Sequence, residues 1–85
     1  MNRRWYLSFV GEKGFLGACV VEGESEEEAL LLSHRLKINP GGEVLLIPVP
    51  EKARDLFPLN KLMSKAELAS YGPIHRLGDL KPGEL

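Results

Sequence analysis

Two apolar segments joined by a short glycine-flanked turn constrain this chain's fold more than any other feature. Residues 3–10 (RRWYLSFV) and 15–21 (FLGACVV) are rich in the aromatic and β-branched residues that favour strands. Between them, residues 11–14 (GEKG) place a glycine on either side of two polar residues, which suits a tight reversal. We therefore predict an antiparallel β-hairpin at the start of the chain.

The apolar faces of the strands predict where the core lies. In the first strand, the face that carries Trp5, Leu7 and Phe9 is the stronger core candidate, because side chains alternate between the two faces of a strand. The second strand is apolar on both faces, and so is a third predicted strand at residues 43–49. We therefore expect the second strand to be covered on both sides or to pair centrally, and the third strand to be an inner one.

One main helix is predicted between the second and third strands. Residues 25–28 (SEEE) match a capping box, in which a serine caps the helix start and the last glutamate reaches back to it. We expect the helix to run from Glu26 to about Lys37, where the residues 39–42 (NPGG) end it. Its expected packing face consists of Ala29, Leu32, Ser33 and Leu36.

The element order predicts an α+β fold. Residues 51–57 could form one or two helical turns, and residues 60–63 are short and amphipathic. A second capping box at 64–67 (SKAE) opens a short helix that ends near Tyr71. The order is β-β-α-β followed by short C-terminal helices, which favours a small sheet with one main helix packed on it. We expect a compact domain over residues 1–71 and a tail over 72–85 that is either flexible or ordered on a neighbour.

Composition narrows the class of protein. The chain has 85 residues, a formal net charge of −1 and one Cys, so a disulfide framework within one chain is excluded and nucleic-acid binding is not indicated. No apolar run approaches the roughly 20 residues of a membrane span, and no signal peptide is evident, so we expect a cytoplasmic protein without a membrane partner. Three strands leave two edges to cover, which favours a homo-oligomer formed through an edge or through Leu31.

Several segments in this order resemble a family of small uncharacterised proteins from bacteria and their phages. The matching segments are WYLSF at 5–9, FLGAC at 15–19 and NPGGEV at 39–44, followed by a helix start like LMSKAEL at 62–68. The resemblance covers about residues 3–70, and the main helix departs from it in being richer in Leu than in Ala. It implies a phage or mobile-element setting, where small proteins are often inhibitors, decoys or ligand-sequestering modules, and it brings no established activity.

The loop at residues 39–43 is the first candidate binding site. The amides of Gly41 and Gly42 can form a nest for an anion or a carbonyl oxygen, while Asn39 and Glu43 offer directional hydrogen bonds. A purine edge or a ribose hydroxyl suits this loop better than a bare phosphate, because the preceding helix C-terminus disfavours anions. The structural alternative is a helix-to-strand connection with Asn39 near the helix end.

A second candidate lies at the start of the first strand. Arg4 and Tyr6 could pair a phosphate and stack a base, whereas Trp5 is the better core residue. The structural alternative is that Trp5 belongs to the core, while Arg3 and Arg4 keep the start of the strand in contact with solvent. Together the two candidates predict a nucleotide-like ligand bound by Arg4, Tyr6, Asn39, Gly41, Gly42 and Glu43, at an oligomer interface.

No catalytic or metal site is predicted, and no cofactor is expected. Cys19 lies between apolar neighbours, as a buried structural thiol does, and the two histidines, His34 and His75, have no partner at metal-ligand spacing. The serines have no His and Asp in a recognisable motif, so catalysis is left open but is less favoured than binding.

The sequence thus favours a non-enzymatic module that sequesters or recognises a small nucleotide-like ligand. The alternative is an inhibitor or adaptor that binds a host protein through a sheet edge, the acidic helix start at residues 22–28 or the C-terminal tail.

Overall fold

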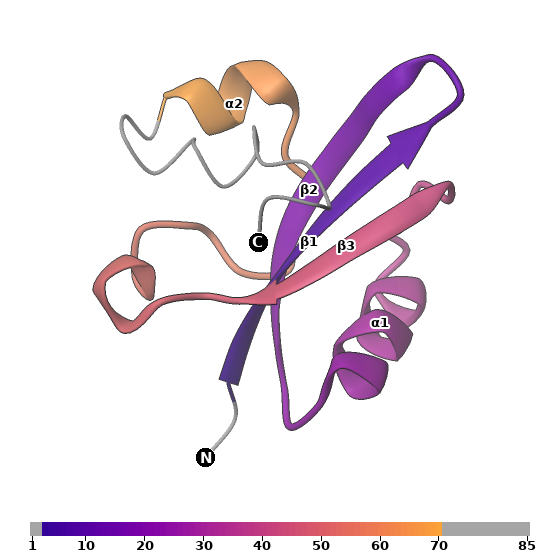
Figure 1. Ribbon diagram of the computed structural model, residues 1–85. Coiled ribbons are helices and arrows are strands. Elements are labelled where there is room, and N and C mark those ends of the chain that lie inside the picture. The colour runs from indigo at the N-terminus through magenta and orange to yellow at the C-terminus, as the bar shows by residue number, and fades with distance from the viewer. Residues whose placement is uncertain (1–2, 71–85) are drawn as a thin grey trace.

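A three-stranded antiparallel sheet with one main helix forms the centre of the molecule in the computed structural model, which describes residues 3–70 (Figure 1). The strands are β1 (Arg3–Gly11), β2 (Gly14–Gly23) and β3 (Glu43–Pro48), and the helices are α1 (Glu26–Arg35), the 3-10 turn η1 (Glu51–Ala53) and α2 (Lys65–Ala69). The predicted α+β class and the β-β-α-β order are confirmed. The predicted tail at residues 72–85 lies outside the described residues.

The strand order is β2-β1-β3, so β1 is the central strand. β1 and β2 form the predicted hairpin, and β3 returns through α1 to pair antiparallel with β1, from Trp5↔Pro48 to Val10↔Glu43. The prediction that the third strand is an inner one is therefore wrong. Its four apolar residues, 44–47, are half-buried, because layers on both faces of the sheet reach only partly over this edge.

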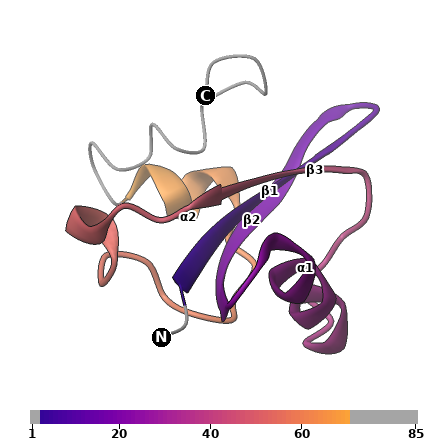
Figure 2. The ribbon, with the colours of Figure 1, turned by 60° about the horizontal axis from the view of Figure 1, so that its bottom comes forward.

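Both faces of the sheet are covered, as the two apolar faces of the second strand predict, although the first strand was expected to bury mainly the face of Trp5, Leu7 and Phe9. Helix α1 lies on one face, and residues 51–69, here named the C-terminal strap, cover the other (Figure 2). The core on the α1 face consists of Trp5, Leu7, Phe9, Cys19, Val21 and Ala29. The core on the strap face consists of Tyr6, Ala18, Val20, Ala53, Phe57, Met63 and Leu68.

The C-terminal strap also closes the outer edge of β2. Ala18 and Met63 exchange both backbone hydrogen bonds (3.0 and 2.6 Å), and the Asn60 amide donates to the Val20 carbonyl (2.8 Å). The small side chains of β2 permit this approach, since a Cβ added at residue 17 would lie 2.9 Å from the Leu62 side chain. The edge of β2 is therefore already paired.

The helix starts are as predicted and the end of α1 is not. The Ser25 side chain accepts a hydrogen bond from the Glu28 amide (3.2 Å), and Ser64 caps α2 in the same way. Helix α1 ends at Arg35 rather than at about Lys37, because Lys37 adopts a left-handed φ of 60°. Among the described residues, no helix is long and apolar enough to cross a membrane.

Candidate functional site

The loop before β3 uses its own polar groups to hold its shape. Asn39 Oδ1 accepts a hydrogen bond from the Gly41 amide (2.8 Å), and Asn39 Nδ2 donates to the Ser33 hydroxyl (3.1 Å). Ser33 is fully buried on α1 and donates in turn to the Leu30 carbonyl (2.6 Å). The carboxamide of Asn39 thus ties the loop to the end of α1, as the structural alternative expects.

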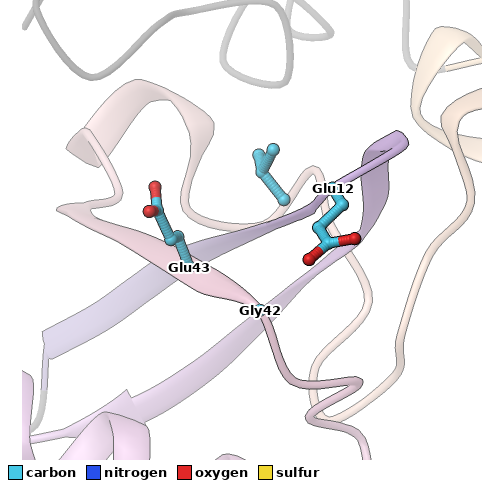
Figure 3. A pocket seen from close by; sticks show the side chains of 5 residues that line it. Glu12, Gly42 and Glu43 are labelled. Carbon is cyan, nitrogen blue, oxygen red and sulfur yellow. The ribbon is translucent and has the colours of Figure 1, made fainter.

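A shallow hollow of about 300 Å³ lies beside this loop. It is lined by Val10, Gly11, Glu12, Gly42 and Glu43. Figure 3 shows the two carboxylates, with Glu12 coming from the turn after β1 and Glu43 from the start of β3. Two exposed carboxylates disfavour the phosphate of a nucleotide, because like charges repel.

Arg4 lies near the other end of β1 and fastens the C-terminal strap to the sheet. Its guanidinium donates to the Arg54 carbonyl (2.6 Å) and lies within ion-pair distance of Asp55 (3.5 Å) and Glu22 (3.8 Å). The Arg4 side chain is only 16% exposed. These contacts give Arg4 a structural role at the junction of β1, β2 and the strap.

Tyr6 is fully buried and packs against Phe57, with their ring centroids 5.8 Å apart. A ring in this position cannot stack on an external base without opening the strap-face core. The Arg4–Tyr6 pair and the Asn39–Glu43 loop also lie at opposite ends of β1, since Glu43 pairs with Val10 and the Arg4 carbonyl accepts from Val49. One copy of the chain does not bring the two predicted groups together.

The potential reactive groups are dispersed. Cys19 is fully buried, and burial raises the pKa of its thiol to about 12, so the nucleophilic thiolate is disfavoured. His34 is exposed on α1, and no group of three or more metal-ligating side chains gathers within residues 3–70. These residues identify no catalytic centre.

The outer edge of β3 is the remaining candidate, and the register shows which backbone groups it presents. Antiparallel strands alternate pairs that exchange backbone hydrogen bonds with pairs that do not. The Val49 amide donates to the Arg4 carbonyl (2.9 Å), so the backbone groups of Val49 face β1. By alternation, the backbone groups of Ile47 and Leu45 also face β1. The backbone groups of Val44, Leu46 and Pro48 therefore point away from β1.

We name these outward groups the open edge: the N–H groups of Val44 and Leu46 and the carbonyls of Val44, Leu46 and Pro48. No segment of the described chain bonds to them. On β2, by contrast, the Ala18 N–H and the carbonyls of Ala18 and Val20 are bonded to the C-terminal strap. Pro48 contributes no N–H, which limits the length of strand that can pair there.

Sequence reasoning overlooked Val44 and Leu46 as candidate site residues. A signal was available, because Pro48 and Pro50 stand at alternate positions, as expected where the backbone nitrogens of one strand side are not needed by a neighbour. That signal indicates an edge strand with its free side toward the prolines.

Comparison with known proteins gives no match to a protein-family model, to a curated protein or to a solved structure.

Proposed function

We propose that this chain is a non-enzymatic module that binds an extended segment of another protein along β3. The observation that carries the proposal is the difference between the two sheet edges. The edge of β2 is paired with the C-terminal strap, while the open edge of β3 keeps unpaired donors and acceptors within the described structure. An extended peptide adds to such an edge through main-chain hydrogen bonds.

The side chains of β3 indicate what kind of segment fits. Val44 and Leu46 lie on the α1 face and Ile47 lies on the strap face. Leu45 shares the face of Ile47 because side chains alternate along a strand, and all four residues are half-buried. An added strand would place its alternate side chains beside these residues and remove apolar surface from water on both faces. The fitting segment is therefore a short strand with apolar residues on both faces.

The nucleotide-like ligand predicted from the sequence has less support. The Asn39 carboxamide is engaged by Ser33 and Gly41, the Tyr6 ring is buried, and the hollow beside Glu43 is acidic. Among the residues predicted to bind the ligand, Glu43 is the one whose side chain is exposed and makes none of the hydrogen bonds or packing contacts described above. The geometry thus favours the protein-binding alternative.

The proposed setting is the cytoplasm, where a thiol such as buried Cys19 stays reduced without a disulfide partner. An origin in a phage or mobile element rests on the resemblance of the strand and loop motifs alone.

The test selects linear peptides from a random library on the full chain and compares their binding to two variants. Leu46→Pro removes an outward N–H and the leucine side chain, whereas Leu46→Ala removes the side chain and keeps the N–H. The native Pro48 shows that β3 accommodates proline at a position whose backbone nitrogen points away from β1, as that of residue 46 does.

We expect selected peptides to bind Leu46→Pro about tenfold more weakly than Leu46→Ala, because one main-chain hydrogen bond is lost. Circular dichroism of both variants controls for folding. Equal affinities for the two variants, or a library that yields no binding peptide, would overturn the proposed function.

A further inference from the structure

We infer that the open edge also accepts a second copy of this chain, with β3 beside β3 in antiparallel orientation around a two-fold axis. The inference rests on the same open edge as the proposed function and adds that the chain is its own competing partner. The resulting sheet would continue through both copies in the order β2-β1-β3-β3-β1-β2.

One self-pairing register satisfies the open edge. When Val44 lies opposite Leu46 of the second copy, the outward N–H groups of both residues, in both copies, each reach an outward carbonyl. A shift in one direction places Val44 opposite Pro48, which has no N–H to give. A shift in the other direction places Leu46 opposite Gly42, which precedes β3.

Side chains and charge are compatible with this register. Leu45 meets Leu45 of the second copy across the two-fold axis, and both were half-buried before pairing. Glu43 lies opposite Ile47, so the two Glu43 carboxylates are attached roughly 14 Å apart along the paired strands. This exceeds the Debye length of about 8 Å at physiological salt, so their repulsion is largely screened.

Self-pairing regulates the proposed function, because a second copy and a protein segment use the same outward backbone groups. Only one of them can occupy the open edge at a time. Binding of a selected peptide should therefore weaken as the chain concentration rises through the dimer dissociation constant.

Cysteine cross-linking of the full-length chain tests the register. In the inferred dimer, residues 45 of the two copies form a directly opposed pair without hydrogen bonds, with Cα atoms about 4.5 Å apart, which a disulfide can span. Residues 47 are attached roughly 14 Å apart on the same face, beyond disulfide reach. The native Cys19 is not expected to form a disulfide in this experiment, because it is fully buried and burial raises the pKa of its thiol.

Under mild oxidation we expect Leu45→Cys to give at least about tenfold more covalent dimer than Ile47→Cys on a non-reducing gel. Equal yields from the two variants would indicate random collision and overturn the inference. The native chain, followed by sedimentation velocity up to about 1 mM, should dimerise, and Leu46→Pro should stay monomeric. A native chain that stays monomeric over that range would also overturn it.

The outcomes separate the two proposals. Dimerisation without peptide binding would leave the self-pairing inference standing and remove the proposed function. Peptide binding by a chain that stays monomeric and does not cross-link would do the reverse.

Discussion

Gly42 shows how a residue that resembles part of a ligand-binding nest can be required by packing alone. Its φ is +76°, and a Cβ added there would lie 2.5 Å from the Val10 carbonyl oxygen. Gly41 has a similar φ of +89°, but nothing lies within 4 Å of its added Cβ. An added side chain would be strained by the backbone conformation at both glycines, but it would also overlap a neighbouring residue at Gly42 alone of the two.

The first prediction compares alanine at these two positions. Gly41→Ala should lower the free energy of unfolding by about 1–2 kcal/mol, the cost of a left-handed conformation for a residue with a Cβ. Gly42→Ala should lose roughly 3 kcal/mol or more, because the β3 start must also move away from β1. Urea unfolding measures both, and equal losses would contradict the close approach of residue 42 to Val10.

The second prediction concerns Asn39. Asn39→Ala removes the acceptor for the Gly41 amide and the donor to Ser33, and should cost about 1–2 kcal/mol of stability. Asn39→Asp keeps the acceptor for the Gly41 amide, but it loses the donor to Ser33 and adds a negative charge at the end of α1, so it should not restore the native stability. If Asn39→Ala has the same urea midpoint of unfolding as the native chain, the Asn39 side chain is not structural and becomes available for the predicted ligand.

The third prediction follows from the buried thiol of Cys19. Burial raises its pKa to about 12 from the ordinary 9.0, so the unfolded chain loses this proton at lower pH than the folded chain does. The stabilisation that this protonated thiol contributes is complete below pH 9 and falls as the pH rises from about 9 to about 12.

Denaturant unfolding of the native chain and Cys19→Ala, at several pH values, isolates this effect. The stability advantage of the native chain should shrink by up to about 1.4 kcal/mol per pH unit above pH 9. An advantage that stays constant with pH would show that the thiol is accessible in the folded chain.

Local sequence signals predict where the strands and helices lie, but they predict poorly which elements pack or pair with one another. The hairpin and both capped helix starts depend on residues close in sequence, and the structure has them where the patterns place them. The C-terminal strap pairs with β2 from some 40 residues away and covers one face of the sheet, so the burial of β3 depends on contacts distant in sequence. The apolar residues on both faces of β3 favour an inner strand and the alternating prolines 48 and 50 favour an edge strand, and the structure agrees with the prolines.

The candidate site followed the same division. The sequence identified Asn39, Gly41 and Gly42 as unusual, but their hydrogen bonds and close contacts are directed within the loop, toward α1 and toward β1. Arg4 and Tyr6 are occupied by the C-terminal strap, a contact that only the tertiary structure reveals.

The fourth prediction tests the anchoring of the C-terminal strap. Met63, in the strap, is fully buried in the strap-face core, so Met63→Ala should cost about 2–5 kcal/mol through lost packing and a residual cavity. Leu56, also in the strap, is 44% exposed, and Leu56→Ala should cost less than about 1 kcal/mol. Similar losses at both positions in thermal unfolding would contradict a strap held at Met63.

At the scale of the whole molecule, two covered faces and one paired edge leave β3 as the side of the sheet that is open within the described structure. Helix α1 and the C-terminal strap lie on opposite faces, and the strap also pairs with β2 (Figure 2). A small chain with this arrangement can bind a partner by extending its sheet without rearranging its core. The central claim is therefore that the outward groups of β3 are free in the monomer.

Residue-resolved amide hydrogen exchange by NMR, at a concentration where the chain is monomeric, tests that claim most directly. The Val44 and Leu46 amides should exchange at least about tenfold faster than the Leu45 and Ile47 amides, whose N–H groups face β1. Adding a selected peptide should slow the exchange of Val44 and Leu46 alone within β3. If Val44 and Leu46 are protected as strongly as Leu45 and Ile47 in the dilute monomer, the edge is already occupied and the account is contradicted.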